Sequence, residues 1–127
     1  MRLELDVLPE RLSVARLPAD APIPAWAAAA TPASITRTAG ELSVVCGEDL
    51  VPDGVRRQDG YRALAVRGPL DFALTGIVSG LTAPLAAAGV PVFVISTFDT
   101  DLVLVPEAHL DRAAATLSGL GHLVAGR

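Results

Sequence analysis

The segment Ser96-Thr97-Phe98-Asp99-Thr100-Asp101 brings two carboxylates and several hydroxyl groups to a predicted strand–turn–strand junction. Neighbouring carboxylates can divide the roles of general acid and general base. The alternative is a plain hairpin turn in which Asp99 and Thr100 satisfy backbone donors. Asp101 fits that alternative less well, because it opens the apolar run 102–105, where a charge needs a partner.

The other residues that could do chemistry give weaker signals. Neither His109 nor His122 stands with a cysteine or an acid at metal-ligand spacing, and Cys46 lies within an apolar strand pattern. The chain contains no lysine, which excludes Schiff-base chemistry. Segment 76–80 also lacks the glycine spacing and the lysine of a phosphate-binding loop. We therefore expect no metal and no cofactor.

The composition excludes several classes of partner. The chain has 127 residues, 51% hydrophobic and 19% charged, which is enough for a folded core. Its net charge of −4 argues against nucleic acid and against an anionic membrane surface, because both favour a basic protein. The start of the chain shows no secretory signal, and Cys46 is the single cysteine. We therefore expect a cytoplasmic protein.

Residues 72–98 carry no charged side chain and are long enough to raise the question of a membrane span. Gly89 and Pro91 interrupt the run in the order that is typical of a helix end. The β-branched and aromatic residues that follow favour a buried strand. We therefore predict a helix over 76–88 and a strand over 92–96, and no membrane partner.

The chain divides into an irregular first half and a more regular second half. The acidic segment 47–60 is the best candidate for a linker, so we predict two domains, residues 1–58 and residues 59–127. Strands are predicted at 3–7, 11–17, 34–38, 42–46, 61–66, 92–96 and 101–105, and helices at 76–88 and from Pro106 onward. The expected buried stripes of the two helices are Ile77, Leu81, Leu85 and Ala88, and Leu110, Ala114, Leu117 and Leu120.

The order of elements in the second half predicts an α+β fold. Strand, helix, strand, strand and helix follow one another, and residues 121–127 either fray or add a last strand. This is the split βαβ pattern of a ferredoxin-like sandwich, βαββαβ. We interpret the first half as a degenerate copy with a poor first helix.

The second half resembles the ACT domain of a small bacterial family. The resemblance rests on Gly76-Ile-Val, on Thr82-Ala-Pro-Leu-Ala, and on the run from Gly89-Val-Pro-Val-Phe to Ser96-Thr-Phe-Asp-Thr-Asp-Leu-Val-Leu-Val-Pro-Glu. It covers about residues 61–120, and residues 10–50 more weakly through Glu41-Leu-Ser-Val-Val. The family is similar to the ligand-binding modules of aspartate kinases and of the animal cytosolic arginine sensor.

The resemblance implies tandem ACT folds packed side by side, with an amino acid held between the two halves. The first half would contribute the backbone and hydroxyl of Ser43 and the backbone of Val44. The second half would contribute backbone N–H groups at the helix start and residues of the strand–turn–strand junction. These are Gly76, Ile77, Thr97, Phe98 and Asp101.

One position departs from the arginine sensor. There, the resemblance implies a carboxylate in the loop before the helix, which meets the ligand's guanidinium. Here the corresponding residue is Leu74, with Asp71 and Phe72 nearby. An apolar or small amino acid is therefore as plausible a ligand as arginine.

The physical chemistry of a free amino acid agrees with this arrangement. Its carboxylate suits a helix N-terminus, where unpaired N–H groups and the helix dipole favour an anion. The glycine at position 76 allows close approach to the backbone. The ammonium group needs a negative charge, and Asp101 can supply it.

Three functions follow from these observations. The resemblance favours a non-enzymatic module that binds an amino acid and regulates an unknown effector protein. The second is a structural or interaction domain that has kept the fold and lost the ligand. The third is an enzyme that uses Asp99 or Asp101 with His109. A homodimer is expected under the first two, because exposed sheet edges pair readily.

Overall fold

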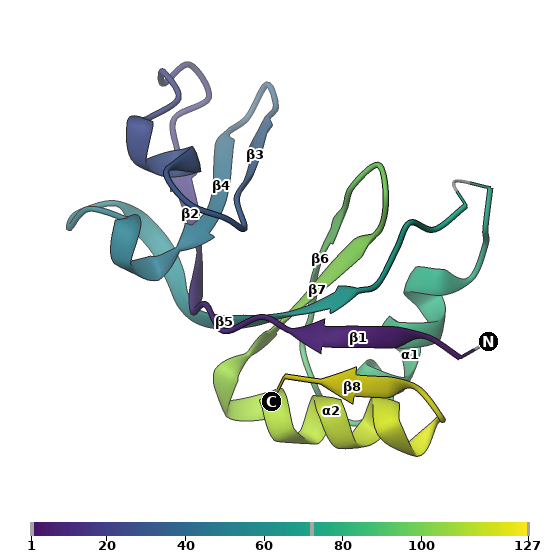
Figure 1. Cartoon of the computed structure of the whole chain (residues 1–127). Helices are drawn as coiled ribbons and strands as arrows, with labels where there is room; N and C mark the ends of the chain where they lie inside the picture. The colour runs from purple at the N-terminus through teal and green to yellow at the C-terminus, as the bar shows by residue number, and fades with distance from the viewer. Residues whose placement is uncertain (1, 72, 127) are drawn as a thin grey trace. The chain divides into compact units, whose positions relative to one another are not determined.

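The computed structural model describes residues 2–71 and 73–126. Its chain forms two compact units. The larger unit consists of Met1–Pro9 and Arg62–Arg127, and the smaller unit of Glu10–Tyr61. Figure 1 shows the elements of both units.

The larger unit is a sheet covered on one face by two helices (Figure 1). Its strands lie in the order β8-β1-β5-β7-β6, where β5 contributes its second half. Neighbours β1 and β5 are antiparallel, as are β6 and β7, whereas β1 and β8 are parallel. The elements are β1 (Glu4–Val7), β5 (Arg56–Val66), α1 (Ile77–Ala87), β6 (Phe93–Ser96), β7 (Asp101–Pro106), the 3-10 helix η3 (Glu107–His109), α2 (Leu110–Gly119) and β8 (Leu123–Ala125).

The core of this unit lies between the helices and the sheet. Leu81 and Leu85 of α1 and Leu117 of α2 are fully buried there, against alternate residues of the strands such as Leu5. The helix spacing of three and four residues and the strand spacing of two place these side chains on facing surfaces. The fold therefore follows from the apolar pattern of the sequence.

The smaller unit is a four-stranded antiparallel sheet with the strand order β3-β4-β2-β5. Its core contains Ala15, Val44 and Cys46, which are fully or almost fully buried. In its described residues, short 3-10 helices stand where the larger unit has α-helices. The elements are β2 (Leu12–Leu17), η1 (Ala25–Ala28), β3 (Ser34–Arg37), β4 (Leu42–Gly47), η2 (Glu48–Leu50) and the first half of β5.

The two units share one plan. If β1 is set aside, each unit has four strands in the ferredoxin-like order, with the first strand between the fourth and the third. In the larger unit β1 is inserted between the first strand, β5, and the fourth, β8. The first strand directly follows an arginine in the smaller unit (β2) and contains one in the larger unit (β5). The third strand, β4 or β7, is followed in each unit by a 3-10 helix that begins with glutamate. Arg11 pairs with Glu48 at 3.3 Å in the smaller unit, and Arg62 pairs with Glu107 at 3.6 Å in the larger one. Strands β4 and β7 even have the same burial pattern along their six residues.

The predicted α+β class and ferredoxin-like pattern are confirmed, and two expectations about the halves need correction. Segment 47–60 is not a linker, because β5 begins at Arg56 and pairs with β2 of the smaller unit. The first nine residues belong with the second half of the chain, because β1 pairs with β5 and β8. The compact units therefore divide β5 between Tyr61 and Arg62, instead of dividing the chain at residue 58.

The helix stripes agree with the prediction except at the last position of each, because Ala88 follows the end of α1 and is half-buried. Ile77, Leu81 and Leu85 are buried in α1, but Leu120 is 55% exposed. The difference arises because α2 ends at Gly119, so that Leu120 leaves the helical register of Leu117. Ala113, which the prediction omitted, is fully buried instead.

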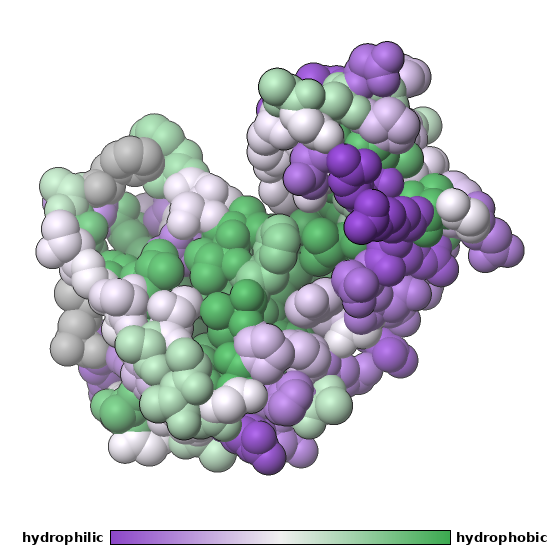
Figure 2. All heavy atoms as spheres, turned by 180° about the vertical axis from the view of Figure 1, so that it is seen from behind, coloured by the Kyte–Doolittle hydropathy of each residue, from purple (hydrophilic) through white to green (hydrophobic). Residues whose placement is uncertain are grey.

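The uncharged run forms a short helix, a connection and a strand. Helix α1 spans Ile77–Ala87 and includes Pro84, and its exposed positions are occupied by small or uncharged residues. In Figure 2, the side of the molecule where α1 lies is drawn mostly in white and green. Within the described part of the chain, no helix is both long enough and apolar enough to cross a membrane.

Candidate functional site

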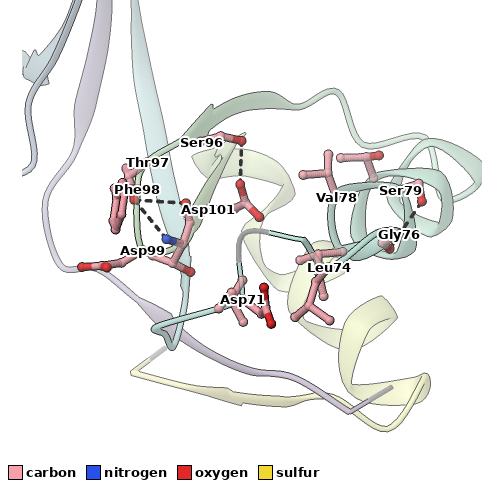
Figure 3. Close-up of a pocket in the computed structure, with 14 residues that line it drawn as sticks. Asp71, Leu74, Gly76, Val78, Ser79, Ser96, Thr97, Phe98, Asp99 and Asp101 are labelled. Atoms are coloured by element: carbon pink, nitrogen blue, oxygen red, sulfur yellow. Dashed lines mark hydrogen bonds between the residues drawn. The ribbon is translucent and has the colours of Figure 1, made fainter.

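A pocket of about 530 Å³ opens in the larger unit between the start of α1 and the turn that joins β6 to β7 (Figure 3). Its volume lies in the usual range for small-molecule sites. All its lining residues belong to segments 70–82 and 96–101. The two rims of the pocket are therefore the β5–α1 connection and the β6–β7 turn.

Asp101 is the most constrained polar residue of the pocket. It is only 9% exposed and is the first residue of β7, opposite Ser96 at the end of β6. The Ser96 hydroxyl donates a hydrogen bond of 2.6 Å to Asp101 Oδ1. Among the residues that the structure describes, Asp101 forms no ion pair. In Figure 3 its carboxylate faces the pocket, across from the α1 side.

The opposite wall is the uncapped start of α1. Gly76 occupies the N-cap position with φ +79°, in the left-handed region that glycine adopts without strain, and no side chain caps the helix. The first backbone N–H groups of a helix have no partner within the helix. This wall therefore offers hydrogen-bond donors and the positive end of a helix dipole.

The turn between β6 and β7 is held by its own threonines. Thr97 donates its N–H to the Thr100 carbonyl at 2.8 Å, and the Thr97 hydroxyl accepts the Thr100 N–H at 3.1 Å. Phe98 lies at the tip and is 84% exposed. Asp99 points away from the pocket in Figure 3. The predicted hairpin turn is thus correct for residues 97–100, but the side chain that satisfies a backbone donor is Thr97, where the prediction named Asp99 and Thr100.

The charge of the lining is negative. The lining residues include Asp71 and Asp101, and also Asp99, whose carboxylate points away from the pocket; none of the described lining residues is arginine, lysine or histidine. Asp71 Oδ1 accepts the N–H of Ala73 at 2.9 Å, which fixes the connection before α1. The pocket therefore favours a ligand that presents a positive group to Asp101.

The structure brings six of the eight predicted site residues to this pocket. They are Leu74, Gly76, Ile77, Thr97, Phe98 and Asp101. Ser43 and Val44 lie on β4 of the smaller unit, with paired strands on both sides. Their backbone groups face the sheet ladder, so the half-buried side chain of Ser43 is the part left for a ligand.

The prediction missed Ser96 and Thr100. Both could have been found from the hairpin register, because a four-residue turn over 97–100 places Ser96 opposite Asp101. Phe72, named beside Leu74, lies outside the described residues.

The alternatives based on histidine and cysteine lose support. His109 follows the far end of β7, about 17 Å along the strand from Asp101, so these two residues cannot form an acid–base pair. The Nδ1 atom of His122 accepts the N–H of Leu3 at 3.0 Å. Cys46 is buried, and this burial raises the pKa of its thiol. The described residues contain no group of three or more His, Cys, Asp and Glu that could hold a metal ion.

The strand order, the two helices on one face and the pocket at the first helix define a ferredoxin-like α+β protein. The family model described as the ACT domain matches residues 56–119, and a second model, described as an N-terminal domain, matches residues 10–54. The chain belongs to the ACT domain family.

Solved structures of other proteins are similar to this chain. A protein from Agobacterium tumefaciens is 40% identical, with a TM-score of 0.94 over 100% of this chain and 95% of that one. A Vibrio cholerae protein of unknown function, described as a possible transport protein, is 13% identical, with a TM-score of 0.75 over 92% and 88%. The ligand-free regulatory subunit of aspartate kinase from Thermus thermophilus is 10% identical, with a TM-score of 0.63 over 91% and 95%. The last two similarities concern the fold.

Proposed function

We propose that this protein is a non-enzymatic regulatory module that binds a free α-amino acid in the pocket of the larger unit. The observation that carries the proposal is that a negative group and a set of backbone hydrogen-bond donors face each other across the pocket. A nearly buried carboxylate without an ion-pair partner among the described residues, Asp101, faces the uncapped N-terminus of α1. A zwitterionic amino acid has an ammonium group that suits Asp101 and a carboxylate that suits the start of α1.

The α-carboxylate of the ligand would lie at the start of α1. The N–H groups of Ile77 and its neighbours would donate to it, and the helix dipole favours a negative charge there. Gly76 has no side chain to block the approach, and its surroundings are open: a Cβ atom placed there would meet nothing within 4 Å. The ligand can therefore come close to the backbone on this side.

The α-ammonium group would lie at Asp101. One oxygen of this carboxylate accepts the Ser96 hydroxyl, which leaves acceptor capacity for a cation. A charged hydrogen bond of this kind contributes about 1.5–3 kcal/mol. A bound ammonium group would also supply the partner that a nearly buried carboxylate needs.

The family favours regulation over catalysis. A structural neighbour is named a regulatory subunit, which supports a regulatory role for this chain as well. In this proposal the smaller unit is a degenerate copy of the larger one, and the response passes to another protein. We also expect a homodimer, because β3 lies at one edge of its sheet and β6 at another.

The proposal is tested with the full chain, first shown by native mass spectrometry to carry no small molecule. Each of the twenty amino acids is added at millimolar concentration and the melting temperature is measured. At least one should raise it, because a ligand that binds the native state stabilises it. Isothermal titration calorimetry then gives its Kd. The absence of a response to all twenty would refute the proposal.

Two aspartates provide a matched pair of variants. Asp101→Asn should weaken binding of the responding amino acid by about 10-fold to 100-fold, because it removes the charge and keeps the size. Asp99→Asn changes charge equally two residues away, but its side chain points away from the pocket, so its Kd should stay within about twofold. Equal losses in both variants would indicate a general charge effect. The expected contact from Ser43 stays a prediction, and Ser43→Ala tests it in the same assay.

A further inference from the structure

We propose that Thr100 and Gly68 are positioning residues of the ligand site, because they tie its two rims together. This inference rests on the proposed function. Neither residue needs to touch the ligand. Both lie where the β5–α1 connection crosses the β6–β7 turn, and we call this crossing the rim latch. It consists of residues 66–70 and residues 99–100.

Two hydrogen bonds form the rim latch. The Thr100 hydroxyl donates to the Val66 carbonyl at 2.6 Å, at the last residue of β5. The Leu70 N–H donates to the Asp99 carbonyl at 2.7 Å. The first bond is partly buried. The second joins a backbone group of one rim directly to a backbone group of the other.

Gly68 makes this close crossing possible. A Cβ atom at this position would lie 2.9 Å from the Asp99 carbonyl oxygen and 3.2 Å from the Thr100 Cβ atom. The first of these is a backbone atom and cannot move aside as the end of a flexible side chain can. Glycine is needed here for space, and any larger residue would push the two rims apart.

The rim latch sets the separation between Asp101 and the start of α1. Asp101 directly follows Thr100, and Gly76 lies at the other end of the connection that Leu70 anchors. If the latch opens, the carboxylate and the helix start are no longer held at one separation. When only a fraction of the molecules holds the binding-competent arrangement, the apparent Kd is the intrinsic Kd divided by that fraction. The latch therefore preorganises the site for a ligand that bridges both walls.

The first test compares three threonine variants by calorimetry with the amino acid that binds the wild type. Thr100→Val removes the hydroxyl and keeps the shape, and should raise Kd about fivefold or more, as expected for one hydrogen bond. Thr100→Ser keeps the hydroxyl and should stay within about twofold. Thr116→Val is the matched control, because that hydroxyl bonds to the Arg112 carbonyl within α2, outside the pocket. A Thr100→Val protein that binds as the wild type does would overturn the inference and leave the proposed function intact.

The second test needs no ligand. Amide hydrogen exchange measured by NMR should be at least about fivefold faster at Leu70 in Thr100→Val than in the wild type, while the Leu81 amide in the core of the unit is unchanged. Unchanged exchange at Leu70 would show that the hydroxyl does not hold the rims. If no amino acid binds, both the proposed function and the positioning role are refuted. The exchange rates still show in that case whether the rim latch exists.

Glycine variants give an independent check of the crossing. Gly68→Ala should speed exchange at Leu70 and raise Kd by at least as much as Thr100→Val. Gly119→Ala is its control, because a Cβ atom there would meet nothing within 4 Å. Should Gly68→Ala misfold, the Thr100 series decides alone. A well-folded Gly68→Ala protein with wild-type Kd and exchange would contradict the steric argument.

Discussion

Replacing Asp101 by leucine should stabilise the protein and abolish ligand binding. The reason lies in the corresponding position of the smaller unit. Leu42 opens β4 as Asp101 opens β7, at the last pair of each hairpin, and the two strands have the same burial pattern. Leu42 is fully buried. The same strand position is thus compatible with leucine in the related sheet.

The magnitude follows from burial and partners. Asp101 is 9% exposed and has one hydrogen bond, from Ser96, whose own side chain can turn to solvent. A charge in this position costs free energy, and a leucine would bury apolar surface instead. We expect Asp101→Leu to raise the free energy of unfolding by about 1–3 kcal/mol. For a domain of this size that corresponds to a rise in melting temperature of about 3–10 °C.

The assay is urea unfolding of ligand-free protein, followed by circular dichroism at 222 nm. This signal reports mainly on the larger unit, because α1 and α2 both belong to it. Asp101→Asn serves as the intermediate variant, since it removes the charge without adding apolar surface. A loss of stability in Asp101→Leu would refute the reasoning, because the carboxylate would then be part of what holds the fold together. A gain accompanied by unchanged ligand binding would remove Asp101 from the site.

Two further predictions concern the core and the surface. Leu117→Ala should lower the free energy of unfolding by about 2–5 kcal/mol and Leu120→Ala by less than about 1 kcal/mol, because the first side chain is fully buried and the second is 55% exposed. Urea unfolding of both variants measures the difference, and equal losses would contradict the end of α2 at Gly119. The hydrogen bond and charge of Arg67 lower the pKa of Asp6, so this ion pair stabilises the protein above about pH 4 and is lost as the pH falls through the lowered pKa. Asp6→Asn should therefore flatten acid unfolding below pH 4, and an unchanged profile would show that the exposed pair contributes nothing.

Much of the fold could be predicted from local pattern. The alternation in residues 3–7 predicted β1, the more apolar run 42–46 predicted β4, and the Ala-Ala-Gly-Val-Pro sequence at 87–91 predicted the end of α1 correctly. These signals depend only on neighbours along the chain, so they are present in a single sequence. The pocket is a different case, because only Asp101 stood out in the sequence itself, as a charge beside an apolar strand, whereas Gly76 entered through the family resemblance.

What escaped prediction depends on pairing between distant segments. The acidic character of segment 47–60 favoured a linker, yet β5 begins at Arg56 within it because β2 supplies the hydrogen-bond partners. Likewise, nothing near β1 indicates that it joins the second half of the chain, since its partners β5 and β8 lie far along the sequence. Strand propensity depends on such context, which a local pattern does not contain.

The shared strand order allows the two units to be compared position by position at the candidate site. Where the larger unit has α1, the smaller one has the short 3-10 helix Ala25–Ala28, which offers no comparable helix dipole. Where the larger unit has Asp101, the smaller one has Leu42. The larger unit thus has both a group suited to a ligand carboxylate and a group suited to a ligand ammonium, and the smaller unit has neither at the corresponding positions. Their joint presence in one unit is what a single zwitterionic ligand requires.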